Sequence, residues 1–588
     1  MSGSPLQQWF STAMEQYTAM QSAIGPLRLT KSDLLFLSMR KMCHDVGTLL
    51  SDLLDDARSA TFGERVKMIL IIITPLIILA SYLLQTPSSA SQLGLPIYNF
   101  GRDYNYPELL TRAAKEHPHT PYIIKFASYE YIVFPSSFFD EIKRIPASTG
   151  SMVEWFTHVF FQGWRFLGSD KSNLHKTIAT DLTRAFSGPQ NAVLSGSEQE
   201  RHVDMAFTSV LGMLTREKWQ RFPLYSLIQE LVAIKNTACL LGEDMAHNRQ
   251  WIRVSQAFPM AVMIAVFACH AVPRVLRPLV SLFVFIPAWA LYWYMRILLR
   301  PMVKKEIADY MEQRGKRKKD TPSDTGLHKS RPKIPMTSWL LSRYLNDQTG
   351  TKAGNAKVPS AVINEILHDY TVLSFEATAS TSATLYFILA ELVTRPELIQ
   401  ELREEMTAVM GSNQKHSTDG LEKLDSVMRE SSRVHNFNHL SLFRRLLTPV
   451  QLSMGPTLPP GSLLCVDAYS IISSPVLWKD PGPEVFDPLR FWKLSRQEQR
   501  RDGKDESGTN KMYKFTSLGS DAPGWGGGSQ ACPGRVFAGD TIKRILARLL
   551  MEFDIEVAHG EKKPSRNSMP NGTLAPDMGA GIMLRRRT

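Results

Sequence analysis

A glycine-rich stretch that ends in a single cysteine constrains this chain more than any other feature. Residues 524–535 read GWGGGSQACPGR, so four glycines precede Cys532 and a Pro-Gly pair follows it. Farther on, apolar residues recur at three- and four-residue intervals, which predicts a helix with one buried face. These residues are Ile542, Ile545, Leu546, Leu549, Leu550 and Phe553. Because proline is tolerated in the first turn, the helix is expected to begin just after Cys532.

This position favours a reactive thiol at Cys532. Backbone N–H groups at the start of a helix, together with the helix dipole, favour a thiolate over a thiol. The glycines allow a tight loop and the close approach of something large and flat. A lone thiolate in such a loop suits one axial bond to the iron of a planar cofactor. The alternative is a structural cysteine beside a flexible loop, which Cys-Pro-Gly alone would favour.

Composition narrows the class of protein. The chain has 588 residues, of which 44% are hydrophobic and 21% charged, as in globular proteins. Its net charge of +12 fits nucleic acid, an anionic membrane surface or an acidic protein partner. No zinc-finger spacing or basic-aromatic interleaving occurs, so we expect no nucleic-acid partner. The five cysteines are scattered without a CxxC, which argues against a disulfide scaffold or a structural zinc site and favours a reducing compartment.

An uncharged run of 17 residues, Met68–Leu84, predicts a transmembrane anchor. Pro75 lies within it and is tolerated in membrane helices. A buried core helix is the alternative, but Arg65 and Lys67 flank one end and a soft linker, residues 85–99, follows the other. Residues 1–67 are predicted to form a tail, with one or two amphipathic helices. The charges on the two sides give no clear orientation.

The remainder, residues 100–588, is predicted to be one catalytic domain, mainly α with small β-sheets. We expect a strand pair at 122–135, a hairpin at 449–468 and a basic exposed loop at 314–335. A second apolar region, 258–299, either forms a helical hairpin in the membrane or, as we expect, long helices. Those helices would dip one face into the bilayer or line an apolar cavity.

Several motifs together resemble one family. The pattern Trp525-x-x-Gly528-x-x-x-Cys532-x-Gly534 resembles the haem-binding loop of the cytochrome P-450 monooxygenases, with Trp525 where phenylalanine is usual. The surrounding stretch from FTSLG to ARLL and the closing LRRRT resemble the fungal secondary-metabolism branch, which includes ent-kaurene oxidases. The order ESSR, hairpin, FDPLRF and cysteine loop agrees with the family. The resemblance covers roughly residue 93 to the C-terminus and implies the cytochrome P-450 fold.

The resemblance implies a set of cofactor-binding residues. Cys532 would be the axial ligand of a haem iron, in a loop completed by Trp525, Gly528 and Gly534. Arg445 matches an arginine that pairs with a haem propionate, although Arg444 is its neighbour. Gln530 stands where relatives carry arginine or histidine against a propionate. Glu430, Arg433 and Arg490 would form a buried charge triad behind the haem. In NLHKTIATDLT, His175 and Lys176 have no clear match to the family.

The resemblance also indicates the oxygen-activating helix, in HDYTVLSFEATASTSATLYFILAEL. The family pattern Ala-Gly-x-Asp/Glu-Thr aligns with residues 376–380. Here Ala379 replaces the acid and Ser380 replaces threonine. We expect Ser380, helped by Glu376 four residues earlier, to organise proton delivery, because residues four apart share a helix face. Alternatively, Thr381 supplies the hydroxyl, and Glu376 binds a substrate hydroxyl or faces solvent.

The implied function is a haem-dependent monooxygenase that hydroxylates or otherwise oxidises a hydrophobic, terpenoid or polycyclic secondary metabolite. Dioxygen and electrons from NADPH would be used, the latter through NADPH–cytochrome P-450 reductase, to which a basic patch on the cysteine side could dock. We expect a single-pass protein of the endoplasmic reticulum membrane with a cytosolic catalytic domain. The departures at Ala379 and Ser380 leave two alternatives: a haem-thiolate isomerase or dehydratase that needs no external electrons, and a non-catalytic membrane-anchored haem- or lipid-binding protein.

Overall fold

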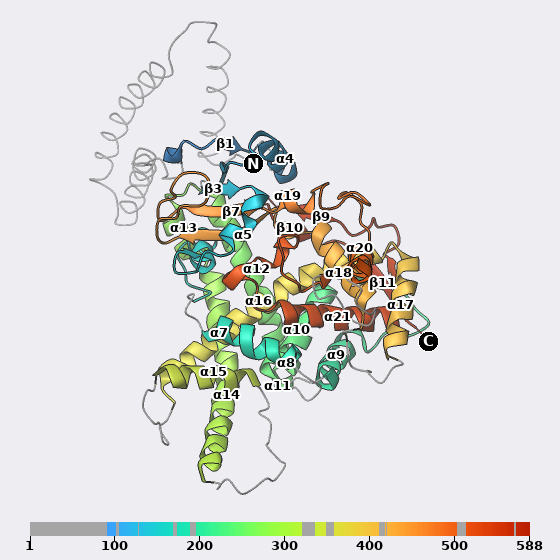
Figure 1. The fold of residues 1–588 in the computed structure, drawn as a ribbon. Helices are drawn as coiled ribbons and strands as arrows, with labels where there is room; N and C mark the ends of the chain where they lie inside the picture. The colour runs from blue at the N-terminus through green and yellow to red at the C-terminus, as the bar shows by residue number, and fades with distance from the viewer. Residues whose placement is uncertain are drawn as a thin grey trace, which may run out of the picture. The chain divides into compact units, whose positions relative to one another are not determined.

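The computed structural model describes residues 91–100, 105–127, 129–168, 173–187, 196–319, 335–348, 358–410, 418, 420–501, 513–569 and 572–587. The predicted tail (1–67), the predicted anchor (68–84) and the first residues of the predicted linker lie outside these ranges. The described part is mainly helical with small sheets (Figure 1), as expected from the sequence.

Apart from α15 (Pro335–Gln348), eight described helices have thirteen or more residues and form most of the helical part. They are α9 (Gly196–Leu211), α10 (Leu224–Leu241), α12 (Arg249–Ala271), α14 (Ile286–Lys319), α16 (Ser360–Leu392), α17 (Pro396–Met410), α18 (Glu422–Val434) and α21 (Arg535–Glu552). The shorter α-helices that the structure describes are α4 (Tyr106–Glu116), α5 (Phe139–Ile142), α6 (Met152–Trp155), α7 (Asn173–Thr177), α8 (Thr183–Ser187), α11 (Glu243–His247), α13 (Arg277–Val284), α19 (Tyr469–Ile472) and α20 (Arg490–Arg501).

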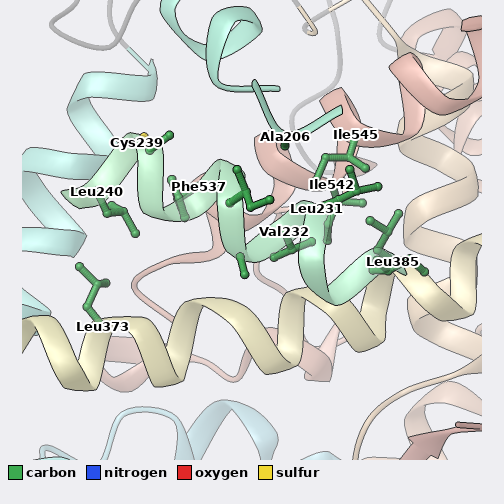
Figure 2. Close-up of a cluster of buried hydrophobic side chains, with 14 of the residues drawn as sticks. Ala206, Leu231, Val232, Cys239, Leu240, Leu373, Leu385, Phe537, Ile542 and Ile545 are labelled. Carbon is green, nitrogen blue, oxygen red and sulfur yellow. The ribbon is translucent and has the colours of Figure 1, made fainter. Parts of the chain in front are cut away.

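Helix α16 runs through the middle of the helical part, and α10 and α21 pack beside it (Figure 1). It begins directly after Pro359 and ends shortly before Pro396, which starts the next helix. A helix that is apolar all round is typical of a protein core. Figure 2 shows α10 between α16 and α21, with Leu231 and Val232 of α10 among the apolar side chains at this junction.

The largest sheet has six strands in the order β1-β2-β3-β7-β6-β4. Its strands are β1 (Ile97–Asn99), β2 (Tyr122–Phe126), β3 (Tyr129–Phe134), β4 (Gly150–Ser151), β6 (Leu440–Leu446) and β7 (Leu463–Asp467). The smaller sheets contain β5 (Gln220–Pro223), β11 (Gly581–Arg586) and β8 (Phe553–Val557), and β9 (Arg566–Ser568) with β10 (Leu574–Pro576). The strand pair predicted at 122–135 is confirmed: β2 and β3 are antiparallel, with Ile123 opposite Ile132.

The hairpin predicted at 449–468 is wrong in its first half. Only one bridge, between Val450 and Leu458, joins the two halves of that stretch. The second half is β7, which pairs with β6 and β3 instead. The stretch contains Pro456, Pro459 and Pro460, and proline cannot donate a ladder hydrogen bond.

Two predicted boundaries also need correction. The linker predicted at 85–99 stops earlier, because Ile97–Asn99 form β1 and pair in parallel with β2. The loop predicted at 314–335 starts later, because α14 continues to Lys319. Arginine and lysine are good helix formers, so the basic run there does not end the helix.

The apolar region 258–299 forms long helices with one buried face each. Helix α12 and the bent pair α13–α14 cover it, with a bend of 46° between α13 and α14. The buried face of α12 includes Phe258 and Val262. On the other side of the region, Phe285, directly before α14, and Met295 within it are also buried. Helices α12 and α16, and the α13–α14 pair counted as one span, have the length and composition of membrane spans, but α16 is mostly buried in the protein.

Candidate active site

The cysteine loop folds back on itself directly before α21. The backbone N–H of Cys532 donates to the carbonyl of Trp525 at 2.9 Å, which closes the loop. Gly528 has φ +66°, and a Cβ there would lie 1.8 Å from the carbonyl oxygen of Lys143, so no other residue fits without moving α5. Helix α21 begins at Arg535, as predicted, with Gly534 as its N-cap.

Trp525 is held in a fixed position beside this loop. Its indole N–H donates to the carbonyl of Phe515 at 2.7 Å, and the two rings meet edge to face at 5.2 Å. A tryptophan at this position therefore packs an aromatic ring beside the cysteine loop, as a phenylalanine would, and makes one hydrogen bond in addition.

Opposing influences act on the pKa of the Cys532 thiol. Burial raises its pKa to about 11, hydrogen bonds from the backbone N–H groups of Gly534 and Arg535 lower it, and the Glu376 charge raises it. The helix-start effect expected from the sequence is thus present, but desolvation outweighs it. Coordination to a metal deprotonates a thiol outright, so bond formation to iron would overcome this pKa.

Helix α16 brings Glu376 close enough for its charge to act on Cys532. The Glu376 carboxylate lies 3.3 Å from Nε2 of His175 on α7. Ser380 is exposed, and its hydroxyl donates to the Glu376 carbonyl of its own helix at 3.1 Å. The proton-delivery role of Ser380 and Glu376 stays a prediction, and the contact of Glu376 with His175 becomes visible only in the fold.

The two neighbouring arginines of β6 have different surroundings. Arg444 is 1% exposed, and its Nη1 donates to the carbonyl of Phe443 at 2.8 Å. Arg445 has a side chain that is 31% exposed, with Nη1 3.9 Å from a carboxylate oxygen of Glu154. Its Nε is buried and makes no hydrogen bond. Arg445 is the more exposed of the two, and its contact with a haem propionate stays a prediction.

Gln530 is engaged at both ends of its amide. Its Nε2 donates to the carbonyls of Gly150 at 2.9 Å and Ile145 at 3.2 Å, and its Oε1 accepts from the N–H of Met152 at 2.9 Å. These contacts join the cysteine loop to the segment that carries β4. Any propionate contact of Gln530 stays a prediction.

The predicted charge triad is present and buried. Glu430 is 0% exposed, accepts two hydrogen bonds from Arg433 and a third from Nε of Arg490 at 3.2 Å. Both arginines also donate to backbone carbonyls of residues 472–485. The triad therefore holds this chain segment against α18, which is a structural role.

A cluster of phenylalanine rings next to Glu376 was not expected from the sequence. Phe375 lies 6.3 Å from Phe161 and 5.7 Å from Phe258, ring centre to ring centre. Phe166 joins them at 6.0 Å from Phe258. Phe161 and Phe166 are close in the chain, but Phe258 and Phe375 come from two distant segments. Sequence spacing therefore gives no sign of the aromatic cluster, which we define as Phe161, Phe166, Phe258 and Phe375.

A polar pocket of about 460 Å³ lies elsewhere, between α14 and the N-terminal half of α16. Arg165, Arg296, Glu365 and Asp369 are among its lining residues. Charged walls of both signs do not suit a hydrophobic molecule. The aromatic cluster is the better candidate for the place where such a molecule binds.

Three observations show that the residues around Cys532 fit a haem. Cys532 is partly exposed, and a Cβ at Gly534 would meet no atom within 4 Å, so the space beside the loop is open. Arg445 has a buried, unbonded Nε, and a guanidinium suits a carboxylate geometrically. A single partly exposed cysteine beside open space, together with an arginine whose Nε makes no hydrogen bond, is a residue set that suits a thiolate-ligated haem.

Comparison with known proteins agrees. The cytochrome P450 family model matches residues 267–582. Cytochrome P450 monooxygenase ffsD of Aspergillus flavipes is 33% identical, over 98% of this chain and 99% of its own length. Pyrichalasin C-18 hydroxylase of Pyricularia grisea is 31% identical over 98% of both chains. Cytochrome P450 monooxygenase ccsD of Aspergillus clavatus is 34% identical, over 84% of this chain and 92% of its own length.

The chain belongs to the cytochrome P450 family. It is a monooxygenase of the fungal secondary-metabolism type, which confirms the enzyme class expected from the sequence over the isomerase and binding-protein alternatives. Its cofactor is haem, and its electrons come from NADPH through a reductase, as the family implies.

Proposed function

We propose that Cys532 is the axial haem ligand and that the chain oxidises a large hydrophobic secondary metabolite. The observation that carries this proposal is the cysteine loop, which presents one thiol at the start of α21, close enough to Glu376 of α16 for that charge to act on it. A thiolate-ligated haem supplies the activation of dioxygen for insertion of one oxygen atom. The protein supplies binding, orientation and proton transfer.

Five residues besides Cys532 are proposed to hold the haem or to shape the loop around it. Arg445 binds a propionate through its free Nε, and Trp525 covers the sulfur side. Gly528 lets the loop pack against Lys143, where a side chain would clash, and Gly534 leaves open space for the ring beside the loop. Gln530 holds the loop against the β4 segment and can offer at most a neutral hydrogen bond to the haem.

Proton delivery is assigned to Ser380 and Glu376. A hydroxyl can donate and accept a proton in turn, and Ser380 is exposed one turn after Glu376 on α16. The Glu376 carboxylate can exchange a proton with the imidazole of His175, 3.3 Å away. We infer that His175 orients this carboxylate.

The substrate is proposed to pack against the aromatic cluster. Three of its four rings are almost fully buried, so a hydrophobic, rigid molecule that opens them gains apolar contact. A relative that hydroxylates C-18 of pyrichalasin supports a bulky secondary metabolite and a hydroxylation. A terpenoid or other polycyclic skeleton stays our prediction.

The protein is proposed to be anchored in the endoplasmic reticulum membrane by residues 68–84, with residues 100–588 as a cytosolic catalytic domain. Residues 1–67 would then be a lumenal tail. A second contact is the α12–α14 apolar face, made of Met260, Ile264, Leu279, Leu282, Phe283, Ile286, Trp293 and Ile297, all exposed. Arg296 stacks on Trp293, with 4.8 Å from Cζ to the ring centre, and such aromatic–basic pairs suit a membrane interface.

NADPH–cytochrome P450 reductase is the proposed partner. The basic residues of α21 do not form a free patch for it. Lys543 pairs with Asp425, Arg544 with Asp540 and Glu200, and Arg548 with Asp204. We therefore look for the reductase contact in other basic residues around the cysteine loop.

The test is turnover by reductase-supplemented microsomes supplied with candidate pathway intermediates and ¹⁸O₂. We expect a product that carries one labelled oxygen and depends on NADPH. Cys532→Ala should lose both turnover and the red-shifted Soret band of the reduced, carbon-monoxide-bound protein, whereas Cys269→Ala, a buried thiol on α12, should keep both. Product formed without NADPH, or a Cys532→Ala protein that keeps the band, would overturn the proposal.

A further inference from the structure

Helix α10 packs against α16 and α21 in an apolar junction (Figure 2), and two polar side chains of α10 are buried as well. Lys235 is 0% exposed and Asn236 is 3% exposed, although neighbouring positions of α10 are leucine, valine and isoleucine. Buried polar groups cost free energy unless they are hydrogen-bonded. The hydrogen-bond partners of Lys235 and Asn236 therefore indicate the role of these two side chains.

The partners form one directed chain of hydrogen bonds across three helices. Lys235 Nζ donates to Thr541 Oγ1 at 2.7 Å, and the Thr541 hydroxyl donates to Asn236 Oδ1 at 3.1 Å. Asn236 Nδ2 then donates to the backbone carbonyl of Ala377 on α16 at 2.9 Å. A lysine ammonium can only donate, which sets the direction of each bond and the orientation of the Asn236 amide.

The chain joins the two helices that carry the proposed site residues. Thr541 is on α21, the helix that begins three residues after Cys532. Ala377 lies inside the turn that starts at Glu376 and ends at Ser380. Lys235 is further held by Asp540, 4.0 Å from its Nζ, and by the Phe537 ring, 4.7 Å away, both on α21. The network thus connects the cysteine helix to the turn of α16 that carries the proposed proton-delivery residues.

We propose that Lys235, Thr541 and Asn236 are positioning residues that hold the Glu376–Ser380 turn at a set distance and rotation relative to Cys532. Hydrogen bonds in such a chain polarise and strengthen one another in a low-dielectric core. Apolar contacts between α10 and its neighbours tolerate small rotations, whereas three directional bonds do not. The catalytic consequence rests on the proton role proposed for Ser380, but the positional one does not.

A matched pair of variants at one position tests this. Thr541→Val keeps the shape but removes the hydroxyl, and Thr541→Ser keeps the hydroxyl. Asn236→Leu is a second variant that removes the amide at similar size. Thr337→Val serves as a further control. It breaks a buried hydrogen bond between Thr337 of α15 and Tyr370 of α16, which lies before the Glu376–Ser380 turn. The haem-loaded proteins are compared by amide hydrogen exchange of residues 374–384 and by the share of NADPH electrons that appears as hydrogen peroxide.

We expect exchange in that segment to rise about threefold to tenfold in Thr541→Val and Asn236→Leu, the factor that one net hydrogen bond represents. The peroxide share should rise with it, while Thr541→Ser and Thr337→Val stay near wild type. Equal exchange in Thr541→Val and Thr541→Ser would overturn the proposal. Faster exchange with an unchanged peroxide share would support the positioning role and overturn its catalytic consequence. If Ser380→Ala stays fully productive while Thr541→Val does not, the proton role of Ser380 fails and the positioning role stands.

Discussion

Arg433 donates two hydrogen bonds, each 2.8 Å long, to the two carboxylate oxygens of Glu430 one turn earlier on α18. Nε of Arg490 adds a third contact to the same carboxylate. With all three side chains almost fully buried, the carboxylate has no water to replace a lost partner. Loss of either arginine would therefore leave the buried Glu430 carboxylate without one of its charged partners.

Arg433→Ala should prevent stable haem incorporation. Removal of one partner from a buried ion pair typically costs about 3–5 kcal/mol. Arg433→Lys should also fail, because lysine cannot form the two-pronged contact. The measurement is the carbon-monoxide difference spectrum together with the yield of folded protein. Arg201→Ala, which breaks an exposed pair with Glu243, is the control and should cost at most about 1 kcal/mol. A haem-loaded, stable Arg433→Ala enzyme would contradict the structural role.

Glu391 should make the fold sensitive to acid. Burial by itself would raise the pKa of this carboxyl, but hydrogen bonds from His435 and Lys563 outweigh it and lower the pKa from 4.5 to about 2. Arg395 contacts the same carboxylate. Because the folded pKa lies below the unfolded one, the stabilisation is fully present above about pH 5 and is lost as the pH falls towards 2.

The size of this effect follows from the shift, which corresponds to about 3 kcal/mol. Burial also lowers the pKa of His435. The stabilisation that the neutral imidazole gives to the fold is therefore lost as the pH falls below the ordinary pKa of 6.5. We expect Glu391→Gln to lower the melting temperature at pH 7 and to flatten the further fall between pH 5 and 3. Thermal unfolding over that range measures it. An unchanged slope in the variant would refute the assignment.

Ser380→Ala should bind substrate and carbon monoxide normally but divert NADPH electrons into hydrogen peroxide. The alanine removes the one side-chain hydroxyl that we assign to proton delivery. Glu376→Gln should have the same effect more weakly, since the amide still contacts His175. Thr384→Ala, which removes a hydroxyl bonded to the Ser380 carbonyl one turn farther on, is the matched control. Full coupling of NADPH to product in both Ser380→Ala and Glu376→Gln would place the proton path elsewhere.

The α12–α14 apolar face should contact lipid in the full-length protein. Phe283 and Ile286 are 64% and 57% exposed, and apolar patches of this kind are rare on surfaces that face water. In microsomes that contain a photoreactive phospholipid, we expect peptides of α13 and the start of α14 to be labelled. Phe283→Asp should reduce the labelling, whereas Met213→Asp, an exposed residue outside the patch, should not change it. Absence of label on α13 would exclude the contact.

Local chemistry made part of the site predictable from the sequence. The glycines, Cys532 and the apolar stripe of α21 lie within one short segment, so the loop and the helix start follow from turn and helix rules alone. Glu430 and Arg433 are one turn apart, which places both on one helix face whatever the rest of the fold does. The paired strands at 122–135 were predictable for the same reason, because their hydrogen-bond partners are a few residues away.

Contacts between distant segments were decided by the tertiary structure alone. The partner of β7 is β6 rather than the nearer Val450 segment, because three prolines cannot donate to a ladder. The same holds for His175 beside Glu376, for the aromatic cluster and for Asn236 against Ala377. The pairs His175–Glu376, Asn236–Ala377 and Phe258–Phe375 each join residues more than a hundred positions apart in the chain. A sequence determines which groups a helix face carries, but only the packing of helices decides which of those groups meet, because burial selects partners by shape and polarity rather than by separation in the chain.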